Sequence, residues 1–223
     1  MSRYLLSLFV ICACPAFAQH VPTFEEVISL RSVGTVKLSA DGKHVLYTVQ
    51  TADWNENRFD TEIWLSKNGG SPLPLTNTAK GNSSGGEFSP DGKWIAFLAD
   101  RGSKTQIYII NTEGGEARPV TDEDENISSF EWHSSGNSFI FLKPEKEEKR
   151  KKEQEKRYGG FEVDDSEFTR SHLWQIDFNP TLPDLSELPC YEKTDSLKVK
   201  AGCLEWPKAK RITKGDFTVT SFR

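Results

Sequence analysis

The chain has 223 residues, with 28 basic and 33 acidic side chains and a net charge of −5. This mild acidity gives no electrostatic reason to bind nucleic acid, and the length allows one domain or part of a larger one. Beyond the first residues, no apolar run is long enough to cross a bilayer, so we expect no membrane span.

The amino terminus has the pattern of a secretory signal peptide. Arg3 precedes a short apolar run over residues 5–13, and a small-x-small cleavage site ends at Ala18. We predict a signal peptide over residues 1–18 and therefore a periplasmic or secreted protein. Two alternatives are a buried amino-terminal helix and a lipoprotein anchored at Cys14, where the sequence loosely resembles a bacterial lipid-attachment box.

A leading segment over residues 19–34 follows, with one short predicted helix. Thr23 is a suitable helix cap. Phe24, Val27 and Ile28, with Leu30 beside them, would form the apolar face of the helix.

The most informative feature is a repeated five-residue motif, Ser-x-Asp-Gly-Lys. It occurs at Ser39–Lys43 and again at Ser89–Lys93, about 50 residues later. A weaker copy stands at Ser134–Asn137. The Asp-Gly step offers the positive φ angle that a tight hairpin needs. Repetition at this period predicts an array of similar units.

Each repeat contains four short apolar stretches that read as strands. In the second copy, residues 94–99 form a nearly continuous apolar run, which predicts a strand buried on both faces. The predicted strands are 35–38, 44–49, 62–66 and 72–76 in the first copy, 86–89, 94–99, 106–110 and 117–121 in the second, and 129–133, 138–142, 172–177 and 210–213 in the third.

Four short antiparallel strands per unit are typical of the blade of a β-propeller. We predict an all-β fold, an incomplete propeller of about three blades with a short amino-terminal helix. A β-sandwich also strings short strands between turns, but it gives no reason to repeat one turn sequence in successive units. The expected domains are blade 1 over residues 35–80, blade 2 over 81–125, blade 3 over 126–214, and the truncated start of a fourth blade over 215–223.

Two insertions are predicted inside blade 3. The first, residues 143–170, begins with a run of mixed charges and reads as a solvated helix or mobile loop. The second, residues 179–208, reads as an irregular surface excursion. It holds Cys190 and Cys203, which would remain after signal cleavage and could form a disulfide in an oxidising compartment. Two unpaired thiols are an equal alternative.

One apparent catalytic motif is set aside. Residues 81–85 match Gly-x-Ser-x-Gly, the nucleophile elbow of α/β-hydrolases, with Ser83 as the serine. The elbow requires a buried strand before the serine and a helix after it. This string instead reads as a flexible linker between two blades, and no histidine is an evident base for Ser83. We predict no catalytic residue, no cofactor and no metal site in this chain.

The repeat over residues 88–97, followed by Gln106–Tyr108, Gly114–Gly115 and Val120–Thr121, resembles the blade of TolB-type propellers. The same repeat builds the amino-terminal propeller of the prolyl oligopeptidase family of serine peptidases. The leading helix, the charged insertion before Ser171 and the segment Arg211–Phe217 favour the acylaminoacyl-peptidase and dipeptidyl-aminopeptidase branch. This likeness covers most of residues 21–223.

The resemblance implies that the whole protein hydrolyses oligopeptides with a serine nucleophile. In that family the catalytic residues lie in a carboxyl-terminal α/β-hydrolase domain, and the propeller limits access to them. No position here matches those residues, so the chain by itself is expected to be inactive, and peptide substrates would be bound only through the missing domain. The alternatives are a TolB-like periplasmic binding propeller without catalysis and a scaffold that completes its ring by assembly. Open blade edges predict self-association.

Overall fold

The computed structural model describes residues 20–101, 104–145, 156, 159, 170–180, 191–192, 198–199 and 206–222. The chain separates into two compact units, Met1–Leu30 and Arg31–Arg223. The charged run that opens the first insertion, apart from its first residues and Lys156, lies outside the described residues, as do Cys190 and Cys203.

The first unit contains the short helix α1 (Phe24–Ile28). The predicted cap is confirmed, because the Thr23 hydroxyl accepts a hydrogen bond from the Glu26 amide and the Glu26 carboxylate accepts one from the Thr23 amide. This reciprocal capping box satisfies two amides that a helix start leaves without partners. No residue of α1 is buried.

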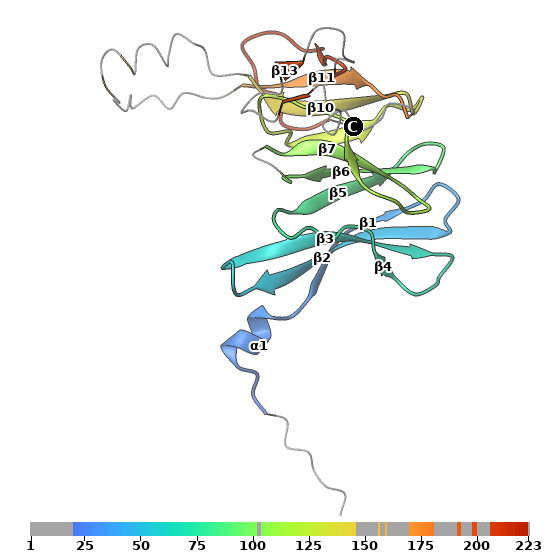
Figure 1. The fold of residues 1–223 in the computed structure, drawn as a ribbon, viewed down its shortest axis with the longest axis vertical. Coiled ribbons are helices and arrows are strands. Elements are labelled where there is room, and N and C mark those ends of the chain that lie inside the picture. Colours follow the sequence, from blue (N-terminus) through green and yellow to red (C-terminus); the bar gives the residue numbers. More distant parts are fainter. Residues whose placement is uncertain are drawn as a thin grey trace, which may run out of the picture. The chain divides into compact units, whose positions relative to one another are not determined.

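The second unit is built from antiparallel β-sheets (Figure 1). Three four-stranded sheets and one two-stranded sheet occur in the described part of the chain. The strands are β1 (Ser32–Leu38), β2 (His44–Asp53), β3 (Arg58–Lys67), β4 (Leu73–Pro74), β5 (Ser83–Phe88), β6 (Trp94–Ala99), β7 (Gln106–Asn111), β8 (Arg118–Pro119), β9 (Ser129–Trp132), β10 (Ser138–Pro144), β11 (Ser171–Asp177), β12 (Tyr191–Glu192), β13 (Lys198–Val199) and β14 (Lys210–Arg211).

The three larger sheets repeat one topology. Their spatial orders are β1-β2-β3-β4, β5-β6-β7-β8 and β9-β10-β11-β14. Each sheet is therefore a meander of consecutive strands, interrupted only in the third by the segment that carries β12 and β13. These sheets are the predicted blades 1, 2 and 3, and the all-β propeller architecture is confirmed.

The hairpin of β2 and β3 is longer than the sequence indicated. β2 and β3 remain paired out to Asp53 and Arg58, whereas the predicted strands stop at residue 49 and start at residue 62. The extension is polar and has no apolar alternation, so its periodicity gives no strand signal. A tight turn closes it, with Asn57 at φ 49°.

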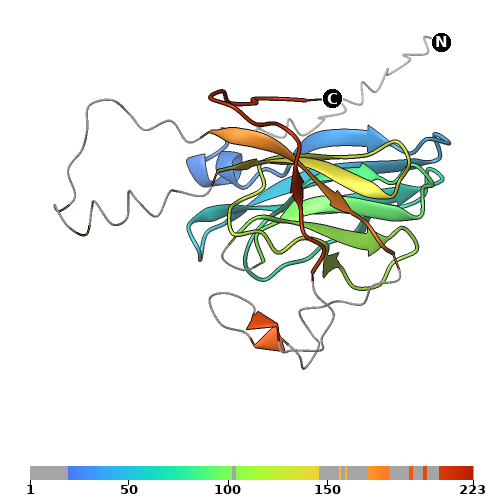
Figure 2. The same cartoon turned by 90° about the horizontal axis from the view of Figure 1, so that it is seen from above.

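The blades are joined by two apolar layers. One layer packs Leu46, Ile63 and Leu65 of blade 1 against Ile95 and Phe97 of blade 2. The other packs the opposite side of blade 2 against blade 3 and contains Ala96, Leu98, Ile107, Ile109, Phe130, Phe139, Phe141 and Ile176. In Figure 2, which looks along the stack, the strands of the successive sheets overlie one another.

β6 lies at the centre of this stack. Five of its six residues are buried, and they alternate between the two layers. The prediction that residues 94–99 are buried on both faces is confirmed.

The connectors between blades also repeat. After β8, the Ile127 amide donates to the Thr105 carbonyl at 3.0 Å, and after β14 the Val219 amide donates to the Ser171 carbonyl at 2.9 Å. Residues 213–222 therefore follow the course of residues 121–130, which lead into blade 3. The second insertion, expected to be irregular, carries the two-stranded sheet β12–β13.

Candidate functional site

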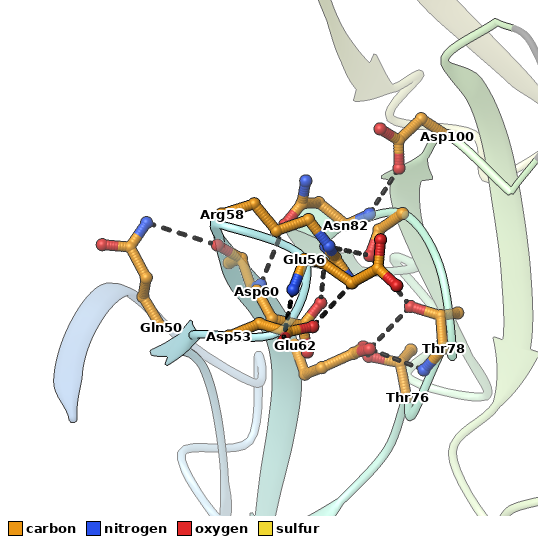
Figure 3. Close-up of polar contacts among 12 residues, drawn as sticks. Gln50, Asp53, Glu56, Arg58, Asp60, Glu62, Thr76, Thr78, Asn82 and Asp100 are labelled. Atoms are coloured by element: carbon orange, nitrogen blue, oxygen red, sulfur yellow. Dashed lines mark hydrogen bonds and ion pairs between the residues drawn. The ribbon is translucent and has the colours of Figure 1, made fainter. Parts of the chain in front are cut away.

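Polar side chains gather toward the turn end of the β2–β3 hairpin in blade 1 (Figure 3). The Arg58 guanidinium lies 3.0 Å from a carboxylate oxygen of Asp60 and 3.9 Å from one of Asp53. Burial, together with the nearby Glu62 carboxylate, raises the pKa of Asp60, and Arg58 opposes that shift. The arginine thus neutralises acidic groups that the hairpin brings together.

Glu62 is the buried centre of this cluster, with 9% of its surface exposed. Its carboxylate accepts hydrogen bonds from the Thr78 amide and the Thr78 hydroxyl, both at 2.6 Å, and a third from the Thr76 hydroxyl. The Thr76 oxygen in turn accepts the Ile63 amide at 2.9 Å. Because the carboxylate is held by three donors of its own chain, it is occupied in structural bonds.

The same arrangement recurs in blade 2 with a neutral side chain. Gln106 takes the place of the glutamate, and its amide oxygen accepts the Thr121 hydroxyl at 2.7 Å and the Glu123 amide at 2.9 Å. The Thr121 oxygen accepts the Ile107 amide at 2.9 Å. A threonine after the outer strand is therefore bonded to the start of the third strand in both blades.

In blade 3 the position is held by His172, which has no exposed surface. Its Nδ1 lies 3.2 Å from the Thr213 hydroxyl, which accepts the Leu173 amide at 3.0 Å. Its Nε2 lies 3.3 Å from Glu145, whose carboxylate also pairs with Arg211 at 2.6 Å. These contacts tie the outer strand β14 to the base of the first insertion.

Another ion pair joins two different blades, blade 2 and blade 3. Lys143 of β10 pairs with Glu123 in the connector after β8, and its ammonium group lies 4.2 Å above the ring of Trp174. Lys143 is buried, so the pair and the aromatic face replace the water that the ammonium group gives up. The contact fixes the connector against the next sheet.

Two asparagines complete the junctions between blades. The Asn82 side-chain oxygen accepts the Thr61 amide, and the Asn126 oxygen accepts the Thr105 amide, both at 2.9 Å. The Asn82 amide donates to Asp100 (Figure 3). These contacts, like the preceding ones, hold the ends of hairpins in place, and they bring together no nucleophile and general base.

The repeated Ser-x-Asp-Gly-Lys motif is a turn that satisfies its own polar groups. In each of the first two copies the serine hydroxyl donates to the aspartate at 2.6 Å and accepts an amide at 2.9 Å, from His44 and from Trp94. The hydroxyl of Ser39 lowers the pKa of Asp41, and that of Ser89 lowers the pKa of Asp91. The motif therefore has a structural role in both blades.

The third copy of the turn uses different residues. His133 replaces the serine, and its ring Nδ1 lies 2.8 Å from the Ser135 hydroxyl, which stands where the other copies have aspartate. The Gly136 amide donates to the His133 carbonyl at 2.8 Å, as the glycine amides of the other copies do to their serines. The turn keeps its conformation in the third copy because its backbone hydrogen bonds do not depend on the identity of the side chains.

Ser83 is the first residue of strand β5 and has no exposed surface. The prediction that residues 81–85 form a linker is therefore wrong from Ser83 onward: the chain pairs with β6 there, because a register shift after Ser84 admits the two glycines into the strand. A strand that continues through the serine is not the strand–turn–helix geometry of a nucleophile elbow. The histidines of the blades take part in the turn and junction contacts, or in β2.

Within the described residues, no group of three or more His, Cys, Asp or Glu side chains could hold a metal ion. The described part of the chain also contains no helix with the length and apolar character required to cross a membrane. The sequence analysis did not find Glu62, Gln106 and His172. They occupy equivalent positions in the three blades, but they are three different residue types, so the sequence shows no repeat there.

Comparison with known proteins relates this fold to peptidases. The chain is 34% identical over 121 residues to the uncharacterized peptidase YuxL of Bacillus subtilis. The match covers 53% of the chain and 18% of that protein. It is 24% identical over 157 residues to dipeptidyl-peptidase 5 of Porphyromonas endodontalis, covering 63% of the chain and 23% of that protein. The chain thus spans less than a quarter of either relative's length.

A solved structure agrees on the fold. The uncomplexed acylaminoacyl peptidase of Pyrococcus horikoshii matches with a TM-score of 0.53 and 21% identity, over 69% of this chain and 24% of that one. No protein-family model matches the chain.

The stacked four-stranded blades define the class: the chain folds as part of a β-propeller, and over part of its length it is similar to proteins named as peptidases. The resemblance to propellers of serine peptidases that the blade motifs indicated is confirmed, over part of the chain.

Proposed function

We propose that this chain forms part of the amino-terminal propeller of an exported serine peptidase that hydrolyses oligopeptides, and that the propeller gates substrate access. The observation that carries the proposal is the 34% identity to a peptidase over 121 residues. In this proposal the chain forms part of the structure that limits substrate access. The nucleophile lies in a region beyond the matched residues, because Ser83 is buried in a strand.

The signal-like pattern over residues 1–18 supports export, with cleavage after Ala18. In an oxidising compartment Cys190 and Cys203 could pair. The relatives are named as peptidases, and acyl transfer through an activated serine is the chemistry that the resemblance of the blade motifs to prolyl oligopeptidase-family propellers implies.

The test uses an antibody raised against residues 20–222 and cells that carry this gene. Periplasmic, secreted and cytoplasmic fractions are treated with a fluorophosphonate, which labels activated serines, and then immunoprecipitated. We expect a labelled polypeptide in an exported fraction. A polypeptide released only by detergent would indicate an anchor at Cys14 instead.

The matched control replaces Ser83 by alanine in the chromosomal gene, and labelling should persist. An exported polypeptide that is recovered intact but never labelled would contradict the peptidase proposal and favour a binding propeller. Loss of labelling on Ser83→Ala would contradict the structural role assigned to that serine.

A further inference from the structure

His172 of β11 contacts segments that lie far apart in the sequence, and it has no exposed surface. Its Nδ1 lies 3.2 Å from the Thr213 hydroxyl, and its Nε2 lies 3.3 Å from a carboxylate oxygen of Glu145. Its ring packs edge to face against the ring of Phe217, with 5.6 Å between the two centroids. One buried side chain therefore joins the end of β10, the segment after β14 and β11 itself.

The repeat shows which ring nitrogen of His172 carries the hydrogen. In blades 1 and 2 the threonine hydroxyl at this junction donates to the Glu62 carboxylate or the Gln106 amide oxygen, while its own oxygen accepts a backbone amide. The Thr213 oxygen likewise accepts the Leu173 amide, so its hydrogen is directed at Nδ1 of His172. A ring nitrogen that accepts a hydrogen bond carries no hydrogen. His172 is therefore neutral, with its hydrogen on Nε2.

Among the described residues, a second proton on this ring has no suitable acceptor. An Nδ1–H group would face the hydrogen of the Thr213 hydroxyl, and the bond that now joins them would be lost. On the other side of the ring, Nε2 is oriented toward Glu145 without making a hydrogen bond, and Arg211 already binds the same carboxylate oxygen at 2.6 Å. A buried charge without a hydrogen-bonded partner is costly, so the folded site favours the neutral ring.

The other charged groups around His172 are already paired or lie in water. Lys143 is the register partner of His172 on β10 and pairs with Glu123, and Arg170 pairs with Asp216 at 3.4 Å. Glu125 pairs with Lys104, and the exposed charged residues of the same segments are Asp122, Asp124, Asp177, Lys210 and Lys214. Water screens the exposed charges. A proton on His172 therefore adds charge to buried surroundings that are already balanced.

The outer strand β14 of blade 3 lies beside this ring and is held by few backbone contacts. It pairs with β11 through Trp174–Arg211 and Gln175–Lys210. A strand held by so few pairs opens locally at a low free energy. The contacts that His172 makes with the segment after β14 are therefore a large share of the interactions that fix this strand.

We propose that His172 is a pH-sensitive switch. In its neutral form it fixes β14 and the base of the first insertion against β11, and in its protonated form it releases both. Histidine is the side chain whose ordinary ionisation falls between about pH 5 and 8, so the release is expected in mild acid. The proposal does not depend on the peptidase assignment, because it involves no substrate.

The experiment compares urea unfolding of the full chain and of His172→Gln between pH 8 and pH 5. Glutamine supplies the acceptor that Gln106 supplies in blade 2, and it takes up no proton. The folding equilibrium constant of the wild type, divided by that of the variant, should fall by about tenfold as the pH drops. It falls because the unfolded histidine takes up a proton near pH 6.5 that the folded site disfavours. The other titrating groups are common to both proteins and cancel in the ratio.

Hydrogen exchange gives a local readout with a matched control. After β14, the Ile212 amide donates to the Leu173 carbonyl at 2.8 Å. At the equivalent place in blade 2, the Val120 amide donates to the Ile107 carbonyl at 2.8 Å. In the wild type the protection factor of Ile212 should fall from pH 8 to pH 5 while that of Val120 is retained. In His172→Gln neither should fall.

The nitrogen NMR signals of the His172 ring give a third measurement, which applies even where the variant folds poorly. At pH 8 they should show a hydrogen on Nε2 and none on Nδ1. A hydrogen on Nδ1 at pH 8 would overturn the proposal, as would an equal loss of protection at Val120. A stability ratio that stays constant or rises toward pH 5 would also overturn it, since a rise would mean that Glu145 stabilises the protonated ring.

Discussion

The hydroxyl of Thr121 has two partners in a place that water does not reach. Thr121 is 1% exposed, and its oxygen accepts one backbone amide while its proton goes to Gln106. Removing such a hydroxyl leaves a buried amide without an acceptor, which costs about 1–3 kcal/mol.

We therefore expect Thr121→Val, which keeps the side-chain shape, to lower the free energy of unfolding by about 2 kcal/mol. Thr121→Ser keeps the hydroxyl and removes only a methyl group, so it should cost less, about 1 kcal/mol. Chemical denaturation of the two variants checks the order. A larger loss in Thr121→Ser than in Thr121→Val would show that packing of the methyl group, and not the hydrogen bonds, determines the role of Thr121.

Individual residues differ in how far they could be predicted. The turn at Ser39 and Asp41 was found because all its side-chain bonds lie within six residues and repeat in sequence. The junction at Glu62, Gln106 and His172 was not found, because three residue types occupy one position and their threonine partners lie far along the chain. What they share is a contact with a threonine hydroxyl, and residue identity does not reveal that.

At the scale of elements, the Asp-Gly turn gives blades 1 and 2 their first hairpin. Gly92 has φ +71°, a conformation that other residues adopt only with strain. Asp91 accepts the Ser89 hydroxyl and the Lys93 amide, and the Ser89 bond is the main reason why its pKa is lowered.

This shift predicts a pH-dependent part of the stability. Because the pKa of Asp91 is lower in the folded state, its stabilising effect is present above the unfolded pKa, near 4, and is lost as the pH falls through the folded value. Its side chain is 54% exposed, so the effect should be below about 0.5 kcal/mol. In urea titrations, Asp91→Asn should be less stable than wild type at pH 7, and the difference should vanish near pH 2.

Ser89→Ala should flatten the same pH dependence, since it removes the principal cause of the shift. A difference that stays constant from pH 7 to pH 2 would mean that the aspartate acts only through geometry.

At the scale of the whole molecule, consecutive blades approach so closely at one contact that any residue larger than glycine would displace a neighbouring side chain. A Cβ on Gly86 of β5 would lie 2.7 Å from a methyl carbon of Leu46 and 3.4 Å from one of Ile63. We expect Gly86→Ala to destabilise the protein by about 1–3 kcal/mol, because the layer between blades 1 and 2 is already filled.

A double-mutant cycle tests this contact. Leu46→Ala opens a cavity and costs about 2–5 kcal/mol alone. It also removes the methyl group that an alanine at position 86 would meet. The double variant should therefore lose less stability than the two single losses added together, as neighbouring sites do. Simple additivity would show that the alanine is accommodated by a shift of the backbone.

The arrangement of the chain in four-stranded blades was predictable from the repeat, because the strands of each blade follow one another along the sequence. The prediction of a linker over residues 81–85 was wrong for a related reason. Glycines that allow a neighbouring sheet to approach closely have the same composition as a flexible connection. The polar extension of the β2–β3 hairpin was also missed, since its strands are held by backbone pairing and ion pairs instead of alternating apolar residues.

The meander topology has a consequence for how the chain acquires its structure. Strands of blades 1 and 2 pair only with near neighbours in sequence, and such local pairing forms quickly. Blade 3 differs, because residues 145–170 separate β10 from β11 and a further long segment precedes β14. Closing these longer loops costs more entropy, so a chain emerging amino terminus first would complete blades 1 and 2 before blade 3, and blade 3 would form the most slowly of the three.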